Sequence, residues 1–436
     1  MKKIKINKVD EVIYYEKLDN GLDIYIYKKE GFEKKCCYIQ TKYGSLNNEF
    51  IPINEDKYVK FPLGIAHFLE HKLFESNDNS NIFSLFEKNG AYVNAATSYD
   101  KTFYYFSSSS NFYDNLSLLI NMVETPYFTD ENVEKEKGII GQEIDMYLND
   151  PESFMYKKVY SNSIINSPLK YDIAGSFDDI NQITKEDLYK CYNTFYNPSN
   201  MSLFIAGDID PVKVIDFIKK IEEKRSINKI NKIVNKEYSE PEYVLKKEEV
   251  VYHNVTKTKI CYTYKNILPK VDKEKDFLRR FYIRIFLSTK FGDCSSFSEN
   301  LIKEGLVNSY FYYDYTFIDN IALIFFSGDV IDDVKVQNRI EESLKDLNDL
   351  EEMFDLYKRN FISGYVNSFE GIDNVINSLR SMVNTYGTVF DNLYELYSNA
   401  SFIDYLSVIK SLSLENKSKV IVKNKEDLNV RSKRSN

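Results

Sequence analysis

The second half of this 436-residue chain repeats the order of apolar and polar segments found in the first half. Residues 102–106 form an apolar run that is followed by Ser107 and a helical pattern, and residues 321–326 form an apolar run that is followed by Ser327 and a helical pattern. Self-similarity on this scale indicates an internal duplication. We therefore predict two duplicated domains of the α+β class, each with an antiparallel sheet and helices packed on one face.

The boundary between the two domains is expected within residues 222–241. This segment is charged, lacks an apolar period and ends at Pro241, which is typical of a linker. We predict an N-terminal domain over residues 1–225, which carries the candidate site described below. A homologous C-terminal domain without a metal site is predicted over residues 242–436. Each is roughly 200 residues long, an ordinary size for a domain.

Turn and capping signals place the elements of the first domain. Asp19-Asn20-Gly21 is a strong hairpin signal between predicted strands at residues 12–18 and 22–27. Pro62-Leu63-Gly64 begins a helix that we expect to run to about residue 75. The other predicted strands lie at residues 36–43, 92–97, 102–108 and 201–206, and the other predicted helices at residues 82–88, 112–123, 130–148 and 185–196 and after Pro151.

Composition excludes several classes of protein. A hydrophobic content of 43% suffices for sizeable cores, and a net charge of −9 argues against nucleic acid as a main partner. No segment approaches the roughly 20 apolar residues of a membrane span, and the N-terminus lacks the apolar region of a signal peptide. Five cysteines, with Cys36 and Cys37 adjacent, favour a reducing compartment. We expect a cytoplasmic protein without a membrane partner.

Two of the three histidines of the chain lie in the sequence His67-Phe68-Leu69-Glu70-His71. On a helix, His67 and His71 lie one turn apart on the same face, with Glu70 beside them. Catalytic zinc typically has three protein ligands and one water, and a neighbouring carboxylate can take a proton from that water. The alternative is a surface helix with two solvated histidines and an incidental Glu. Because histidine is so rare in this chain, we favour the metal site.

The order H-x-x-E-H marks the inverzincins, and the chain resembles the pitrilysin–insulysin family, which includes the mitochondrial processing peptidases. Four stretches carry the resemblance, namely Asn20-Gly21-Leu22, His67 to His71, Gly90 to Ala95, and Glu136 to Glu143. Residues 70–75 and 138–144 are most similar to the short bacterial YmfH-like branch. The resemblance implies a zinc metalloendopeptidase with one Zn²⁺ per chain, in which His67 and His71 are ligands and Glu70 activates the attacking water.

The third zinc ligand is expected from the helix predicted at residues 130–148. Most of its glutamates belong to a solvated face, but Glu143 is surrounded in sequence by Ile139, Ile140 and Ile144, whereas Glu136 lies in a charged run. Spacing alone does not choose between Glu136 and Glu143. The family has paired glutamates seven residues apart and assigns the later one to zinc. The resemblance therefore implies Glu143 as the ligand and Glu136 as an outer partner that orients the site.

The resemblance also implies how a peptide substrate is held. Asn94 and Ala95 match family positions on a strand edge, where an extended peptide adds as a further strand. Taken alone, Asn94 is as well explained as a strand-end residue.

One part of the family pattern is absent from the second half. Typical relatives carry an Arg and a Tyr around a Gly-Leu pair, and these side chains help to hold the substrate and the oxyanion. Here the pair is Gly305-Leu306, while Asn308 stands at the Tyr position and the Arg position falls near Leu301. The candidates to replace this tyrosine are Tyr310, Tyr312 and Tyr315.

The resemblance further implies a clamshell chamber that admits peptides or unfolded segments. In the short branch one chain forms half of this chamber, so a partner chain is implied, either a second copy or a paralogue without the motif. Two alternatives stay open. In the first, the chain is a non-catalytic or weakly active subunit of a heteromeric peptidase complex, which the complete motif disfavours. In the second, it is a dedicated maturation peptidase for one ribosomal peptide.

Overall fold

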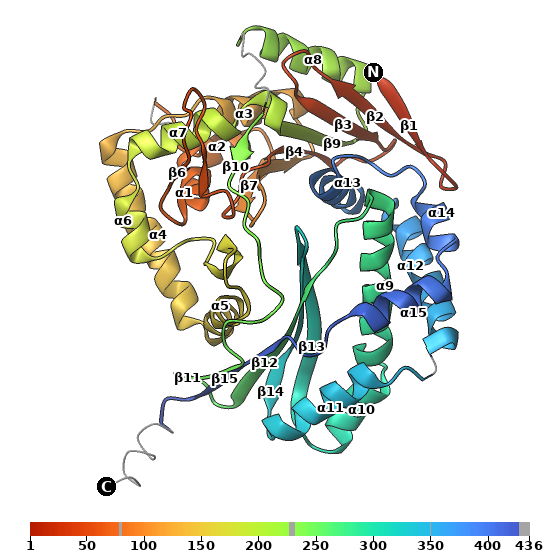
Figure 1. Cartoon of the computed structure of the whole chain (residues 1–436). Helices are drawn as coiled ribbons and strands as arrows, with labels where there is room; N and C mark the ends of the chain where they lie inside the picture. Colours follow the sequence, from red (N-terminus) through yellow and green to blue (C-terminus); the bar gives the residue numbers. More distant parts are fainter. Residues whose placement is uncertain (78–80, 226–231, 349, 427–436) are drawn as a thin grey trace. The chain divides into compact units, whose positions relative to one another are not determined.

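The computed structural model describes residues 1–77, 81–225, 232–348 and 350–426 (Figure 1). The chain divides into two compact units, and each is assembled from separate parts of the sequence. The first unit comprises residues 1–144, 172–237 and 365–393, and the second comprises the rest of the chain. The domains predicted at residues 1–225 and 242–436 are contiguous in sequence, whereas the compact units are defined by contacts between residues. The predicted bounds of the two duplicated halves therefore stay a prediction.

Each unit is built around one large sheet (Figure 1). The strands of the first sheet are β1 (Lys2–Ile6), β2 (Glu11–Lys17), β3 (Asp23–Lys28), β4 (Lys35–Thr41), β7 (Ala91–Thr97), β8 (Thr102–Ser108) and β9 (Met201–Gly207). The strands of the second are β11 (Glu248–His253), β12 (Thr258–Ile267), β13 (Val307–Ile318), β14 (Ile321–Val330) and β15 (Lys417–Asn424). A small sheet contains β5 (Glu49–Ile51), β6 (Val59–Lys60) and β10 (Val234–Asn235).

The two large sheets share one topology. Within the described residues, the first sheet has the order β1-β2-β3-β9-β4-β8-β7 and the second has the order β11-β15-β12-β14-β13. The pairs β3–β9 and β11–β15 are parallel, and every pair that follows them in the two orders is antiparallel. The last five strands of the first sheet therefore correspond one to one to the strands of the second. The predicted duplication and fold class are confirmed, although the parallel pair in each sheet was not predicted.

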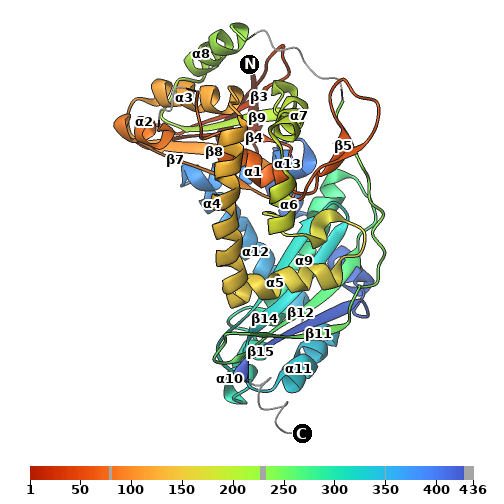
Figure 2. The ribbon, with the colours of Figure 1, turned by 90° about the vertical axis from the view of Figure 1, so that its left-hand side faces the viewer.

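The helices of the first half lie close to their predicted positions. The main helices of the first unit are α1 (Ile65–Lys72), α2 (Ile82–Lys88), α3 (Phe112–Glu124), α6 (Phe177–Gln182), α7 (Lys185–Phe195), α8 (Pro211–Glu223) and α13 (Ile372–Tyr386). Those of the second are α5 (Pro151–Ser163), α9 (Lys273–Phe291), α10 (Ser296–Lys303), α11 (Asp333–Lys345), α14 (Leu393–Ser398) and α15 (Phe402–Ser411). The helices α4 (Asp130–Asn149) and α12 (Leu350–Ser368) contain residues of both units, as does α14, whose first residue Leu393 belongs to the first unit. Figure 2 shows α4 as one continuous helix.

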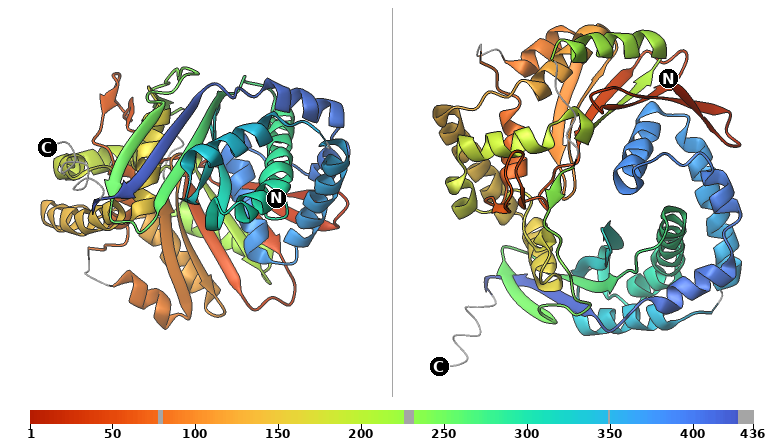
Figure 3. Two further views of the ribbon diagram at one scale, coloured as in Figure 1. Left: turned by 90° about the horizontal axis from the view of Figure 1, so that it is seen from below. Right: turned by 45° about the horizontal axis from the view of Figure 1, so that its top comes forward.

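Helices cover both faces of the first sheet. On one face, the ring of Phe106 on β8 lies 5.9 Å from the rings of Phe86 on α2 and Phe112 on α3. On the other face, the guanidinium of Arg380 on α13 lies 3.7 Å from the ring centroid of Phe103, and Figure 3 shows α13 (blue) beside the N-terminal strands (red). The sequence predicted helices on one face only, because α13 comes from a distant part of the chain.

Two parts of the segment expected to be a linker belong to the folded structure. Val234 and Asn235 form β10, which pairs antiparallel with β5. Further on, Glu240 is 8% exposed. A charged run looks solvated in the sequence, and only the tertiary partners show that part of it is buried.

Glu240 is the centre of a buried polar cluster in the second unit. Its Oε1 accepts hydrogen bonds from the Ile165 N–H at 2.7 Å and from Lys265 Nζ at 2.6 Å. Its Oε2 accepts from the N–H groups of Asn166 and Ser167, each at 2.8 Å. Burial opposes ionisation, but these bonds outweigh it and hold the pKa of Glu240 below its ordinary value. The carboxylate therefore fixes the chain after α5 against β12.

Two sequence expectations concern location. Among the described residues, no helix combines the length and the apolar character needed to cross a bilayer. The five cysteines are free thiols, four of them buried and Cys294 exposed. The cytoplasmic location stays a prediction.

We expect Lys265→Met to destabilise the protein strongly. The side chains of Lys265 and Glu240 are 0% and 1% exposed, and breaking a buried ion pair by removing one partner typically costs about 3–5 kcal/mol. The double variant Lys265→Met/Glu240→Gln removes both charges and should unfold at a higher urea concentration than Lys265→Met alone. Urea unfolding followed by circular dichroism measures both, and a double variant less stable than the single one would contradict this account.

Candidate metal centre

The fold of helix α1 decides where its two histidines point. Phe68 and Leu69 are fully buried and fix the apolar face of the helix against the core. The side chains of His67 and His71 keep 12% and 25% exposure, and their ring centroids lie 4.6 Å apart. The predicted arrangement of the two imidazoles on one helix face is therefore present in the structure.

The start of α1 is held by a close approach between two stretches of backbone. Gly64, the N-cap residue, has a left-handed conformation with φ of 81°. A Cβ at Gly64 would lie 2.2 Å from the carbonyl oxygen of Ala174. Gly175 is also left-handed, and its Cβ would lie 2.7 Å from the carbonyl oxygen of Leu63. Only glycine allows both the backbone conformation and the contact, so these positions fix where the helix begins.

Glu143 of α4 brings a carboxylate to the two imidazoles. Its Oε2 lies 3.7 Å from Nε2 of His67 and 3.5 Å from Nε2 of His71. Tetrahedral zinc with bonds of about 2.0–2.2 Å keeps its ligand atoms roughly 3.3–3.6 Å apart, close to these two separations, so the three side chains suit one Zn²⁺. In the described part of the chain, this is the one group of three or more His, Cys, Asp or Glu side chains close enough to hold a metal ion.

The burial expected for the two paired glutamates is reversed. Glu136 is 5% exposed, whereas the side chain of Glu143 is 23% exposed. Ile139, which was expected to shield Glu143, is 45% exposed. The sequence argument from neighbouring isoleucines was therefore wrong, although Glu143 does reach the histidines. Glu136 is buried because it has partners that the sequence does not show, Nδ1 of His71 at 3.0 Å and Nζ of Lys72 at 3.6 Å.

Glu70 is buried beside the two imidazoles, with 8% of its surface exposed. Burial raises the pKa of Glu70 above its ordinary value, and a hydrogen bond from Thr97 opposes this shift. Thr97 Oγ1 donates that bond to Glu70 Oε2 at 2.6 Å. The sequence analysis did not identify Thr97. Its place at the end of the strand that carries Asn94 was the available signal, since β7 lies against α1.

The two imidazoles have opposite electrostatic environments. Burial lowers the pKa of His67 to about 3, which keeps its ring neutral and able to bind a metal at neutral pH. Burial also acts to lower the pKa of His71, but the hydrogen bond and charge of Glu136 outweigh it and raise the pKa. Nδ1 of His67 is buried without a hydrogen-bond partner among the described residues. Two imidazole nitrogens and one carboxylate are a donor set that suits zinc.

Strand β7 lies at the edge of the first sheet. Asn94 is exposed on this strand, where its Nδ2 donates to the hydroxyl of Tyr92 at 2.9 Å and its Oδ1 accepts the N–H of Ala95 at 2.8 Å. Within the described residues, β7 pairs with β8 only. The role of Asn94 and Ala95 in binding a peptide stays a prediction, for which an edge strand is the required context.

The candidate tyrosines of the second half lie on β13 in the second unit. The hydroxyl of Tyr312 donates to the carboxylate of Glu152 and accepts from Tyr156 at 3.2 Å. The guanidinium of Arg284 lies 5.4 Å from the ring centroid of Tyr315. The side chain of Tyr310 falls outside the described residues. A role of these tyrosines in substrate binding stays a prediction.

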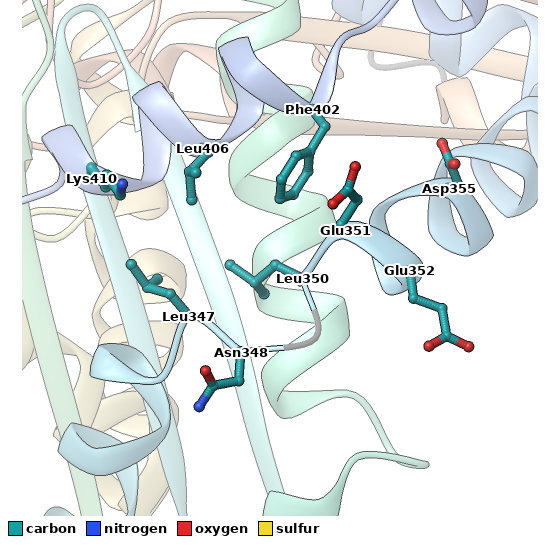
Figure 4. Close-up of a pocket in the computed structure, with 9 residues that line it drawn as sticks. All are labelled: Leu347, Asn348, Leu350, Glu351, Glu352, Asp355, Phe402, Leu406 and Lys410. Carbon is teal, nitrogen blue, oxygen red and sulfur yellow. The ribbon is translucent and has the colours of Figure 1, made fainter.

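The second unit also contains a groove of about 810 Å³ at the N-terminal end of α12 (Figure 4). Its lining combines apolar and charged side chains, namely Leu347, Asn348, Leu350, Glu351, Glu352, Asp355, Phe402, Leu406 and Lys410. The lining contains no histidine or cysteine, so this groove does not offer the donor set found in the first unit.

Comparisons with known proteins agree with this geometry. Residues 53–176 match the family model Insulinase (Peptidase family M16), and residues 182–359 match the model Peptidase M16 inactive domain. The chain is 35% identical over 424 residues to the protein named Uncharacterized zinc protease YmfH of Bacillus subtilis (strain 168). The matched residues make up 97% of this chain and 96% of that protein.

Solved structures show the same fold. A crystal structure described as an M16-like peptidase from Alicyclobacillus acidocaldarius is 27% identical, has a TM-score of 0.88, and covers 94% of this chain and 98% of its own. The periplasmic protease PqqL from Escherichia coli is 18% identical, with a TM-score of 0.74, and the match covers 99% of this chain and 49% of PqqL.

Two similar α+β units, with a His-His-Glu group on the first, define the scaffold of an inverzincin-type metallopeptidase. The chain belongs to the insulinase family, peptidase family M16. The predicted recognition is confirmed. The model of the inactive domain begins at residue 182, within the predicted first domain, so the predicted domain bounds and the absence of a metal site from the C-terminal domain stay predictions.

We expect Gly64→Ala to weaken both the fold and the metal centre. The added methyl group would meet a backbone carbonyl at a left-handed position, and such strain costs about 1–3 kcal/mol. Gly138→Ala is the matched control, because Gly138 lies within α4 with no atom near its added Cβ and should gain about 0.5–1 kcal/mol. Thermal melting and zinc titration measure both variants. A Gly64→Ala protein that melts and binds zinc like the parent would refute the role of the close approach.

Proposed function

We propose that this chain is a zinc-dependent endopeptidase that cleaves peptides or unfolded segments. The observation that carries the proposal is the convergence of His67, His71 and Glu143 on one point beside the buried carboxylate of Glu70. The donor set suits one Zn²⁺ per chain, and the relative YmfH is named a zinc protease.

Bound zinc would supply a Lewis acid that polarises the scissile carbonyl and makes a water more acidic. Glu70 is proposed to take the proton from the attacking water and then to give it to the leaving amine. The burial that raises the pKa of Glu70 favours this exchange, because a carboxylate with a higher pKa is a better base. Thr97 holds Oε2 of Glu70, which leaves Oε1 as the oxygen available for the proton.

Glu136 is proposed to orient one of the two histidines. Its Oε1 faces Nδ1 of His71 at 3.0 Å, so it accepts a hydrogen bond from the protonated Nδ1, and the lone pair of Nε2 stays available for the metal. A carboxylate in this position fixes both the tautomer and the orientation of a metal-binding imidazole. Glu143, which faces both Nε2 atoms, is proposed to be the third ligand.

An extended substrate is proposed to pair with the edge of β7. The strand ends at Thr97, the residue that contacts Glu70, so a peptide bound along this edge is led towards the catalytic carboxylate. Asn94 and Ala95 lie within the strand and are proposed to contact the peptide backbone. Tyr312 and Tyr315, with Tyr310, are the proposed candidates for a further contact from the second half.

A partner chain is proposed to complete the chamber around the substrate. The match to PqqL covers nearly all of this chain but only 49% of PqqL, so PqqL has twice the length in one polypeptide. We propose that two chains, either two copies or this chain and a paralogue, supply the equivalent here. A non-catalytic subunit is the alternative. The complete set of His67, Glu70, His71 and Glu143 favours an active enzyme.

We expect Glu70→Gln to keep zinc bound and to lower the rate of peptide hydrolysis by at least about 10²–10⁴-fold, since Glu70 is proposed as a base and not as a ligand. His67→Ala should instead lose the metal. Elemental analysis and hydrolysis of a peptide library, with and without a chelator, test both variants. Loss of zinc from the Gln variant would overturn the assignment of Glu70.

We expect Glu143→Gln to weaken zinc binding more than Glu136→Gln does. Removing a ligand oxygen takes away a direct bond to the metal, whereas removal of an orienting partner typically costs about 10–100-fold in affinity or activity. Chelator-competition titrations rank the two variants. The opposite ranking would mean that Glu136 is the ligand.

A further inference from the structure

Lys72, the residue that follows His71, has a side chain with no exposed surface. Lys265 is the other fully buried lysine among the described residues. A buried ammonium is strongly destabilising unless it is paired and hydrogen-bonded. The partners of Lys72 therefore indicate what this charge does within the fold.

The ammonium of Lys72, the last residue of α1, contacts α4 and the residue Glu75 that follows α1. It donates to the carbonyl oxygen of Asn132, in the first turn of α4, at 3.0 Å. It lies 2.7 Å from Oε2 of Glu75 and 3.6 Å from Oε2 of Glu136. The other oxygen of Glu136 faces Nδ1 of His71 at 3.0 Å. One carboxylate is thus held between a lysine and a histidine that are neighbours in the sequence.

We propose that Lys72 is a positioning residue of the zinc site and that it acts through Glu136. The inference rests on the proposed function only in so far as the site binds zinc. By holding Oε2, the ammonium fixes the plane of the carboxylate so that Oε1 stays on Nδ1 of His71. That contact keeps the proton on Nδ1 and directs the lone pair of Nε2 towards the metal.

The contact with Asn132 gives the same ammonium a second effect. Asn132 is itself fixed, because its N–H donates to Thr129 Oγ1 at 3.1 Å and its Oδ1 accepts the N–H of Thr129 at 2.9 Å. Lys72 therefore ties the end of α1, which carries both histidines, to a rigid first turn of α4, which carries Glu143. This tether does not depend on Glu136, so we expect its own contribution to zinc affinity to be small beside the contribution that acts through Glu136.

A purely structural role for Lys72 makes a different prediction. In that case the ammonium would serve only to pair with Glu75, its nearest carboxylate, and to fill the core. Glu75→Gln is the matched control because it removes that carboxylate and leaves both the Glu136 and the His71 contacts in place. If Lys72 acts through Glu136, Glu75→Gln should change zinc affinity by less than about twofold, well below the loss typical of an orienting partner.

A double-mutant cycle on zinc affinity tests the proposal. The variants are Lys72→Met, Glu136→Gln and the two combined, each titrated with zinc against a chelator. Lys72→Met should weaken zinc binding about 10-fold in the parent, at the lower end of the range for orienting partners, and by less than about twofold in the Glu136→Gln background. An equal loss in both backgrounds, or no loss in the parent, would overturn the proposal.

A second measurement does not need zinc or activity. The chain has three histidines, so ¹⁵N-histidine labelling gives few ring signals. In the metal-free protein, Lys72→Met and Glu136→Gln should both shift the Nδ1 signal of His71, Glu75→Gln should leave it in place, and Lys72→Arg should restore most of it. An unchanged His71 signal in Lys72→Met contradicts the inference.

Two further comparisons keep the test decisive. If Lys72→Met does not fold, the double variant Lys72→Gln/Glu75→Gln replaces it, because it keeps the net charge of the parent. Its zinc affinity is compared with that of Glu75→Gln alone, and the difference reports the loss caused by removing the ammonium of Lys72. If the parent protein binds zinc but cleaves no peptide, the proposed function fails and the role of Lys72 is still measured. If the parent binds no zinc, both the proposed function and the role of Lys72 in a zinc site are overturned.

Discussion

The meeting of α1 and α4 is the constraint on which the candidate site depends. Three ligand atoms can share one ion only if two helices from separate parts of the chain are held to within a few tenths of an ångström. The structure achieves this with contacts of different kinds. Glycines at positions 64 and 175 fix the start of α1, its apolar face fixes its rotation, and Glu136 and Lys72 join its last turn to α4.

Local elements were predicted well from the sequence because their signals are local. Helix α2 and strand β8 have the predicted ends, at residues 82–88 and 102–108, since an Asn-Gly stop and an alternating apolar run act over a few residues. The placement of His67, Glu70 and His71 also followed from helical geometry alone. Strands β1, β5, β6 and β10 were missed, because a periodic pattern does not stand out over strands of two to five residues.

Burial could not be predicted in the same way, because distant partners decide it. Glu136 lies in a run of charged residues, yet it is buried because His71 and Lys72 meet it from another helix. Glu240 lies in an apparent linker, yet Lys265 and three backbone N–H groups enclose it. In both cases the sequence shows the charge and hides its partner. The family resemblance and the neighbouring isoleucines both favoured Glu143, but the burial expected from those isoleucines is found at Glu136 instead.

The duplication shows where the two halves differ. Both sheets share a five-strand order with one parallel pair, so the scaffold itself is common to both. Between β4 and β7 the first half inserts α1 with its histidines, whereas between β12 and β13 the second half inserts α9 and α10, which contain none.

The units are nevertheless not independent in sequence. Helix α13 covers a face of the first sheet, with Arg380 over Tyr38 and Phe103, so the sheet beside the metal centre is completed by a segment that follows most of the second half. The unit that carries the candidate site therefore draws its residues from three separate parts of the chain, the last of them residues 365–393.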